Sequence, residues 1–360
     1  MTTTINNEQK KLNVPNLRFP EFQGEWEKYR IEDITENISS GRCKSYSSNG
    51  KYNLYGSTGI IGKTDEACYE GNLVLVARVG ANAGSLQIIN EPCGITDNTL
   101  IIKPKKVDAQ YIYYFLQHLN LNRLVFGSGQ PLITGGMLKK VIVSLGNIQE
   151  QNKLTRLLSL LDERIATQNK IIDKLQSLIK GIAQHCIREL INGWEYVRLG
   201  DICKITTGKL DANAQVENGQ YPFFTCAERP FNIDSYAFDT EALLISGNGA
   251  NLGYINYYKG KFNAYQRTYV LDHFSVNIQY VKWALKVLLP QRISIEKSSS
   301  NTPYIVLSTL ADLKIPIPNN SKQNHIANLM MSFERKLSTQ LALSDLYNKQ
   351  KQYLLRQMFI

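Results

Sequence analysis

The sequence has little of what most catalytic and metal sites need. It contains only four histidines, and none of them lies beside a paired carboxylate or a nucleophile in a recognisable setting. It has no G-x-x-x-x-G-K-[ST] phosphate loop and no H-E-x-x-H motif. The segment "GNGANLG" (247–253) is rich in glycine, but its spacing is not G-x-G-x-x-G and predicts a tight turn after a strand. We therefore expect no reaction centre, no metal and no cofactor in this chain.

Cysteines and long apolar runs are also scarce. The six cysteines are scattered without a C-x-x-C pair, which indicates reduced thiols in a cytoplasmic protein. The first 25 residues are polar, and no apolar run approaches the roughly 20 residues that a membrane-spanning helix needs. We expect neither a signal peptide nor a membrane span.

Positive charge, by contrast, is in excess. The chain has 41 Lys and Arg against 31 Asp and Glu, which gives a formal net charge of +10 and a sequence pI near 9.1. This balance favours a polyanionic partner, nucleic acid before an anionic membrane surface. Because the positive residues are spread along the chain, a purely solubilising charge is the alternative.

The chain repeats itself. "WEKYRIEDITENISSGR" starts at Trp26, and "WEYVRLGDICKITTGK" starts at Trp194. Further on, "NLVLVARVGANAG" (72–84) matches "EALLISGNGANLG" (241–253). "SGQPLITGGMLKKVIVSLGNIQEQNKL" (128–154) matches "SSNTPYIVLSTLADLKIPIPNNSKQNHI" (299–326). Since the period is about half the chain, the pattern predicts a duplicated domain and not a solenoid of short repeats.

Each copy shows the same order of elements. A strand-rich segment with Gly and Asn turns comes first (roughly 26–105 and 194–272). A helix follows, "DAQYIYYFLQHLN" with Asp108 as its N-cap in the first copy and "NIQYVKWALKVLL" in the second. A loop, a brief strand and a long helix close each copy. The predicted boundaries are domain 1 at 1–146, a long helix at 147–190, domain 2 at 191–318 and a second long helix at 319–360.

The long helices have coiled-coil spacing. After Asn147, which we expect to form a capping box with Glu150, apolar residues recur at steps of four and three. Sustained over about 33 residues, this stripe predicts a rod of about 50 Å. The second copy is weaker, because Ser344 and Lys351 occupy apolar positions. The predicted seam consists of Leu154, Leu158, Leu161, Ile165, Gln168, Ile172, Leu175, Ile179, Ile326, Met330, Phe333, Leu337 and Gln340.

Two glutamines interrupt this seam at equivalent places. Gln168 and Gln340 each lie near the middle of their helix. If the helices pair antiparallel about a pseudo-twofold axis, the midpoints meet and the two amides satisfy each other, which would fix the register. The alternative is that both side chains are exposed.

This combination resembles the specificity subunit of Type I restriction-modification systems. The resemblance runs from about Val14 to Ile360 and includes "VPNLRFPEFQGEWE", "GNGANLG" and "QPLITGGMLKKVIVSLGNIQEQNKLTRLLSLLDERI". It implies an α+β fold in which two tandem, duplicated target-recognition domains are separated by a long antiparallel two-helix coiled coil with pseudo-twofold symmetry. Each domain would read one half of a split DNA sequence.

The resemblance also implies partners. Two methylation subunits would methylate adenine from S-adenosylmethionine, and restriction subunits would use ATP and Mg to cleave the double-stranded DNA. The chain itself would be non-catalytic and would bind no membrane.

Residues that could contact DNA lie in or beside the turn-rich loops, where basic and amide groups can reach phosphates or base edges. In domain 1 they are Arg42, Lys44, Lys63, Arg78, Asn82, Ser128 and Gln130. In domain 2 they are Lys209, Arg229, Asn248, Asn251, Arg267, Ser299 and Asn301. Arg267 is equivalent to Asn98, and arginine favours guanine where asparagine favours adenine. For each residue, a solvated surface role is the alternative.

Two other functions are compatible with parts of the pattern. A duplicated adaptor could bind protein or RNA, although the ordered aromatic motif of an RNA-binding sheet is not apparent. A stand-alone DNA-modifying enzyme is the third possibility, with "NTPY" (301–304) as a loose match to the N-P-P-Y signature of amino-methyltransferases. Trp26 and Trp194 are expected in the core, where they would anchor the first strand of each copy.

Overall fold

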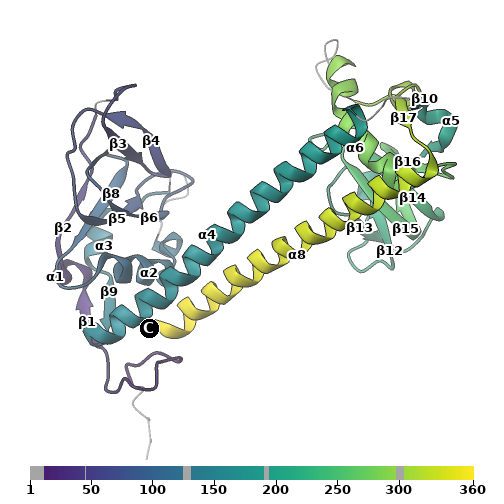
Figure 1. Cartoon of the computed structure of the whole chain (residues 1–360). Coiled ribbons are helices and arrows are strands. Elements are labelled where there is room, and N and C mark those ends of the chain that lie inside the picture. The colour runs from purple at the N-terminus through teal and green to yellow at the C-terminus, as the bar shows by residue number, and fades with distance from the viewer. Residues whose placement is uncertain (1–11, 45, 125–130, 190–193, 297–303) are drawn as a thin grey trace, which may run out of the picture. The chain divides into compact units, whose positions relative to one another are not determined.

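The chain folds into two compact units that interrupt one another in sequence. The computed structural model describes residues 12–44, 46–124, 131–189, 194–296 and 304–360. Unit 1 comprises Met1–Asn169 and Leu343–Ile360, and unit 2 comprises Lys170–Ala342 (Figure 1). Each unit therefore includes half of each long helix, whereas the boundaries predicted from the repeat set the long helices apart from the domains.

Unit 1 contains three small sheets. β1 and β9 pair antiparallel and join the start of the domain to the strand that precedes the long helix. A four-stranded sheet has the order β2-β8-β5-β6, and a three-stranded sheet has the order β4-β3-β7 with β3 and β7 parallel. The strands are β1 (Glu27–Arg30), β2 (Thr35–Ser40), β3 (Tyr52–Gly56), β4 (Gly59–Thr64), β5 (Asn72–Ala77), β6 (Leu86–Asn90), β7 (Cys93–Ile95), β8 (Thr99–Pro104) and β9 (Ile142–Leu145).

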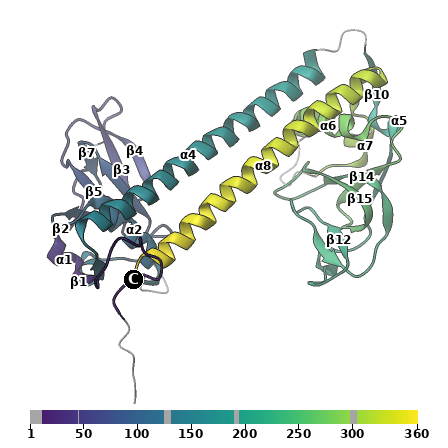
Figure 2. The same ribbon diagram turned by 60° about the horizontal axis from the view of Figure 1, so that its bottom comes forward.

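Unit 2 has the same order of strands in two sheets. β10 pairs with β17, and a six-stranded sheet has the order β11-β16-β14-β15-β12-β13. Figure 2 labels β10, β12, β14 and β15 of these strands. One long strand, β15, pairs with β14 over most of its length and with β12 at its end. The equivalent segment of unit 1 is split into β6 and β7 at Pro92, since proline cannot donate a ladder hydrogen bond. The strands are β10 (Glu195–Arg198), β11 (Lys204–Thr207), β12 (Tyr221–Phe224), β13 (Phe231–Ile233), β14 (Phe238–Ser246), β15 (Ile255–Ala264), β16 (Thr268–Asp272) and β17 (Lys314–Ile317).

Helices pack against each main sheet, α2 in unit 1 and α6 in unit 2. The predicted cap of α2 is confirmed, because the Asp108 side chain accepts a hydrogen bond from the Gln110 amide. In unit 2, Asn277 caps α6 in the same way. The helices of unit 1 are α1 (Ile31–Ile34), α2 (Ala109–Leu119), α3 (Gly135–Lys139) and the 3-10 turn η1 (Leu121–Leu124). Those of unit 2 are a π-helical turn (His185–Glu189), α5 (Leu199–Ile202), the 3-10 turn η3 (Ala212–Ala214), α6 (Ile278–Glu296) and α7 (Leu307–Ala311).

The central strands are buried on both faces. In β5, Val74 and Val76 join the main core beneath α2, while Leu73 and Leu75 face a second cluster that includes β7. This explains the continuous apolar run "LVLV". Trp26 is 4% exposed and lies in the main core of unit 1, as expected, and Trp194 packs partly buried against the core of unit 2.

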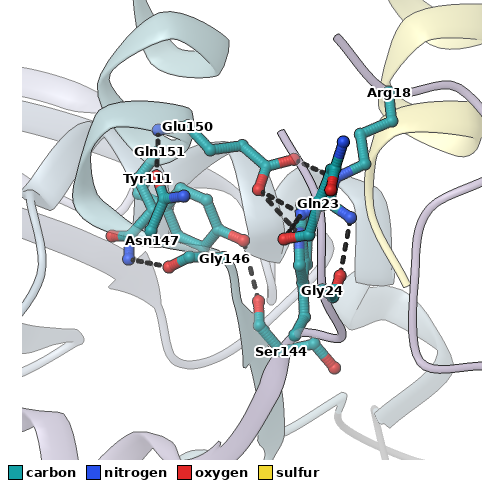
Figure 3. A network of polar contacts seen from close by, with 10 residues as sticks. Arg18, Gln23, Gly24, Tyr111, Ser144, Gly146, Asn147, Glu150 and Gln151 are labelled. Atoms are coloured by element: carbon teal, nitrogen blue, oxygen red, sulfur yellow. Dashed lines mark hydrogen bonds and ion pairs between the residues drawn. The ribbon is translucent and has the colours of Figure 1, made fainter. Parts of the chain in front are cut away.

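The long helices are α4 (Ile148–Gln184) and α8 (Asn320–Met358). Asn147 caps α4 by accepting from the Glu150 amide at 2.9 Å, so this part of the expected capping box is confirmed. The reciprocal bond, in which the Glu150 carboxylate would accept from the Asn147 amide, is not formed. That carboxylate instead accepts from Arg18 and from the Trp26 indole (Figure 3).

Within each unit the two helix halves pack antiparallel. In unit 1, Leu154 and Leu158 share a core with Leu355, Met358 and Phe359. In unit 2, Leu175 and Ile179 share a core with Ile326 and Met330, and Phe333 and Leu337 pack against it. Most of the predicted seam residues are buried, and Ile165, Phe333, Leu337 and Gln340 are half-buried. The pairing of Gln168 with Gln340 stays a prediction.

Among the described residues, no helix combines the length and the apolar character that a membrane span requires.

Candidate nucleic-acid interface

Three strand ends of unit 1 meet at one edge of the four-stranded sheet. β8 runs antiparallel to both β2 and β5, so the ends of β2 and β5 lie beside the start of β8. Main-chain hydrogen bonds join them there, from the Gly41 amide to the Thr99 oxygen and from the Arg78 amide to the Asn98 oxygen, both at 2.9 Å. We call residues 41–44, 77–85, 96–98 and 131–134 the loop edge of unit 1.

A glycine holds the first segment of this edge. A Cβ atom on Gly41 would lie 2.3 Å from the carbonyl oxygens of Ile95 and Thr96, which no other residue type can tolerate. This close approach fixes the backbone where Arg42 and Lys44 follow. Both side chains are exposed.

The loop after β5 forms the second segment. Gly80 and Gly84 have φ angles of 80° and 90°, a region that favours glycine, and the expected tight turn is confirmed. The loop is tied to residues 131–134 by bonds from the Gly80 amide to Pro131 and from the Ile133 amide to Arg78. Asn82 is exposed in this loop, whereas Arg78 is half-buried and donates to the Ser40 hydroxyl at 3.4 Å.

Unit 2 repeats three of these main-chain hydrogen bonds among the described residues. The Gly208 amide donates to Thr268 at 3.2 Å, the Gly247 amide to Arg267 at 2.8 Å, and the Ile305 amide to Gly247 at 2.8 Å. A Cβ on Gly208 would lie 1.9 Å from the Ala264 oxygen, and Gly249 and Gly253 have φ angles of 78° and 81°. The loop edge of unit 2 comprises residues 208–210, 246–254, 265–267 and 304–306. The duplication therefore extends to individual main-chain contacts.

The side chains on the two edges differ. Arg42 corresponds to Lys209, which is also exposed, so a cation follows the glycine in both units. Arg78, however, corresponds to Gly247, and Asn98 corresponds to the exposed Arg267. The edges thus present their arginine and amide groups from different strand ends on the same main-chain frame.

Two amides on the edge of unit 2 are partly buried. The Asn251 side chain donates to the Cys226 oxygen at 3.0 Å and so ties the loop after β14 to the loop after β12. Asn248 forms an isolated bridge with Tyr304. Nearby, burial raises the pKa of Tyr269 despite the charge of Arg267, and its neutral hydroxyl donates to the Ile305 oxygen at 2.9 Å.

The other predicted residues lie away from these edges or outside the described residues. Lys63 is exposed on β4, where its oxygen accepts from the Ser47 amide, and Arg229 is exposed in the loop between β12 and β13. Ser128, Gln130, Ser299 and Asn301 lie outside the described residues. Asn98 and Tyr304 belong to the edges, and the register of the repeat could have added both to the predicted set.

The two loop edges present side chains that are suited to binding. They carry guanidinium, ammonium and amide groups, which suit phosphates and base edges. In the described part of the chain, no cluster of three or more His, Cys, Asp or Glu residues is arranged to hold a metal ion. The fold and this site together define a protein with two similar binding modules on long helices.

The chain belongs to the family of the Type I restriction modification DNA specificity domain. The family profile matches twice, at residues 23–177 and 191–343. The sequence is similar to the EcoDI specificity subunit of Escherichia coli, with 45% identity over 134 residues that span 37% of this chain and 30% of that subunit. It is also similar to the MjaIX specificity subunit of Methanocaldococcus jannaschii, with 24% identity across 82% of this chain and 83% of the relative.

Solved structures agree on the fold. The S subunit of a Type I restriction-modification system from M. genitalium superposes with a TM-score of 0.72 at 19% identity, covering 96% of this chain and 99% of that one. A chain from a study of assembly in the type I R-M system has a TM-score of 0.56 at 15% identity, covering 93% and 97%. The predicted resemblance and the fold of two related domains joined by long helices are confirmed, and the protein- or RNA-binding adaptor is not favoured.

Proposed function

We propose that this chain reads a bipartite, asymmetric DNA target, with one loop edge directed at each half-site. The observation that carries the proposal is the pairing of matched main-chain contacts with unmatched side chains on the two edges. A shared frame gives both modules the same approach to the duplex. Different side chains on that frame read different bases.

Within each loop edge, some residues would contact bases and others would contact phosphates. Arginine pairs in a bidentate manner with guanine, and asparagine with adenine, so Arg267 and Asn98 would specify different bases at corresponding positions. The exposed cations Arg42, Lys44 and Lys209 suit phosphate contacts, which supply affinity and make it dependent on salt. Lys63 and Arg229 remain proposed phosphate contacts outside the edges.

The reactions would belong to partner subunits in the cytoplasm. Two methylation subunits would transfer methyl groups from S-adenosylmethionine to adenine, and restriction subunits would cleave with ATP and Mg. Membership of the specificity family supports this division. The edges of this chain contribute binding groups alone, so we propose that the chain is non-catalytic.

Mapping of methylated adenines tests the reading role. In the host genome, deletion of this gene should abolish methylation at one split, asymmetric sequence and leave other marks intact. A symmetric or continuous lost sequence would contradict the two-edge proposal, and an unchanged methylation map would contradict the function itself.

A second measurement tests the non-catalytic role. The purified chain with S-adenosylmethionine and target DNA should transfer no methyl group, whereas the same chain assembled with methylation subunits should transfer methyl groups to adenine. Methyl transfer by the chain alone would place a reaction centre in it.

A further inference from the structure

A polar cavity of about 900 Å³ opens in unit 1 beside the loop edge. The end of α2, the turn η1 and the last turns of α8 line it, and its rim includes Gly84 and Ser85 of the loop after β5. A Cβ on Gly84 would lie 3.0 Å from the Asn122 side chain, so this loop lies directly against η1. The cavity is therefore continuous with the proposed reading surface.

The cavity is positively charged. Its lining includes Arg123, Lys351 and Arg356, and none of the described residues that line it is acidic. Asp162 neutralises Lys351 at 2.5 Å. Arg123 and Arg356 are exposed and form no ion pair within the described part of the chain, and the Arg356 Nε group donates to the Gln352 oxygen at 3.1 Å.

Neutral groups complete the lining. Side-chain amides of Gln117, Asn120 and Asn348 supply hydrogen-bond donors. Burial lowers the pKa of His118 and the charge of Arg123 adds to that effect, while the hydrogen bond with the Leu355 oxygen opposes it. Two unpaired guanidinium groups among neutral donors make a site for phosphate oxygens.

Unit 2 fills part of the equivalent place with apolar side chains, although the counterpart of Arg123 is also an arginine, Arg292. Val287 stands for His118, Leu289 for Asn120 and Ile179 for Lys351, and all three are buried in the core of unit 2. In unit 2, α6 continues through the place that η1 occupies in unit 1, so the two copies differ here in backbone as well as in side chains.

We propose that this cavity receives phosphate groups of double-stranded DNA beside the half-site read by unit 1. The inference rests on the proposed function and adds a contact that is independent of sequence. Arg123 and Arg356 would each hold one phosphate.

The salt dependence of DNA binding tests this proposal. R123Q and R356Q, each assembled with the methylation subunits, are compared with wild type on DNA with and without the target sequence. Each substitution should reduce the slope of log K against log salt by about 0.9, and the double variant by about twice as much. Both DNAs should be affected alike, and the methylated sequence should not change.

K349Q is the matched control. Lys349 is exposed on α8, outside the cavity, and pairs with Asp345, so its loss removes one positive charge from the helix that carries Arg356. Its slope should equal that of wild type. An equal reduction by K349Q, or unchanged slopes for both arginine variants, would overturn the proposal.

Free phosphate ligands provide the remaining comparison. Stabilisation of the wild-type complex against heat by millimolar inorganic phosphate or ATP, lost in the double variant while its DNA binding is unchanged, would identify a free ligand instead of DNA and overturn the proposal. If one of these overturning results is obtained while wild type still methylates a split target, the proposed function stands and this inference alone fails.

Discussion

At the scale of single residues, the two units differ at the start of the long helices. Glu150 is 2% exposed and accepts from Arg18 at 2.7 and 2.8 Å and from the Trp26 indole at 3.1 Å (Figure 3). The equivalent residue in unit 2 is the exposed Lys322, and the buried Trp194 N–H has no hydrogen-bond partner among the described residues. In the described part of the chain, such an anchor by a buried carboxylate is found in unit 1 and not in unit 2.

Glu150→Gln should loosen that segment. The change removes the counter-charge of Arg18, whose side chain is 16% exposed, and leaves one amide oxygen to serve three donors. We expect a loss of about 1–3 kcal/mol in local stability, seen as faster amide hydrogen exchange at residues 12–26 and 148–158. Glu163→Gln, at an exposed position of α4, should leave exchange at wild-type rates. Equal effects of the two substitutions would show that the buried network does not stabilise this segment.

At the scale of elements, the polar residues of α8 meet polar partners in unit 1. Lys351 pairs with Asp162 and lies over the Tyr114 ring at 5.5 Å, and the Ser344 hydroxyl donates to Asn169 at 3.1 Å. These positions weakened the apolar pattern in the sequence, yet the helix continues to Met358. Their hydrogen-bond and ion-pair partners offset the lost apolar contacts.

In unit 2, the acidic residue at the position equivalent to Asp162 also forms ion pairs with lysine. Glu334 on α8 binds Lys282 at 2.7 Å and Lys286 at 3.0 Å, both from α6. Burial raises the pKa of Glu334, but the Lys282 hydrogen bond and the two positive charges outweigh burial and bring the pKa below its usual value. Burial also lowers the pKa of Lys282.

The pH dependence of unit 2 follows from these directions. Because the folded-state pKa of Glu334 is depressed, its stabilisation is complete above the unfolded-state pKa of about 4.3 and is lost as pH falls through the folded-state value. The depressed pKa of Lys282 acts in the opposite range, since its burial penalty is relieved only as pH rises toward the unfolded-state pKa of about 10.4.

Glu334→Gln should therefore lower the free energy of unfolding by about 1.5–3 kcal/mol at pH 7 and flatten its fall below pH 4.3. Urea unfolding between pH 3 and pH 7 measures both effects. Glu217→Gln, at an exposed position of unit 2, should keep the wild-type pH profile. An unchanged profile for Glu334→Gln would show that this ion pair contributes nothing to stability.

The sequence predicted the helices and strands better than it predicted which distant residues their side chains contact. The stripe of α4 followed from spacing because one buried face of a long helix imposes a period on its own residues. The cap at Asn147 followed from its local pattern, but the carboxylate of Glu150 binds residues 124 and 132 positions away. No local pattern encodes such a partner. The exposed or buried state of Asn82 and Asn251 likewise depended on contacts between loops.

The candidate site was predictable to the level of loops. Glycines at fixed places in the repeat indicated turns, and the structure brings Arg42, Arg78 and Asn82 to one edge. Lys63 lies on a strand of the other sheet, because the pairing of β3 with β4 and β7 is set by long-range contacts. The residue type alone does not show whether a lysine or an arginine lies on the loop edge or outside it.

At the scale of the whole molecule, the two edges are alike in backbone and independent in side chains. The main-chain oxygens of Asn98 and Arg267 accept equivalent bonds, from Arg78 and from Gly247. Exchange of these two side chains leaves those main-chain bonds intact. The two residues belong to different units and share no hydrogen-bond partner that the structure describes.

Substitutions at these positions should therefore act on one half of the target each. In the assembled methyltransferase, R267N should cost about 1–3 kcal/mol on the native sequence and move the preference at one base pair of the second half-site from guanine toward adenine. N98R should change the first half-site in the opposite direction. The double variant should show the sum of both effects within about 0.5 kcal/mol, since separate sites without shared partners are additive.

Methylation of a DNA library randomised in both half-sites measures these preferences. R335N, at an exposed arginine of α8, is the control and should leave the methylated sequence unchanged. A single substitution that shifts bases in both half-sites would mean that the edges do not read independently. If all three variants retain the native sequence, specificity lies elsewhere in the loops, and the contrast between Asn98 and Arg267 is a surface difference without a role in recognition.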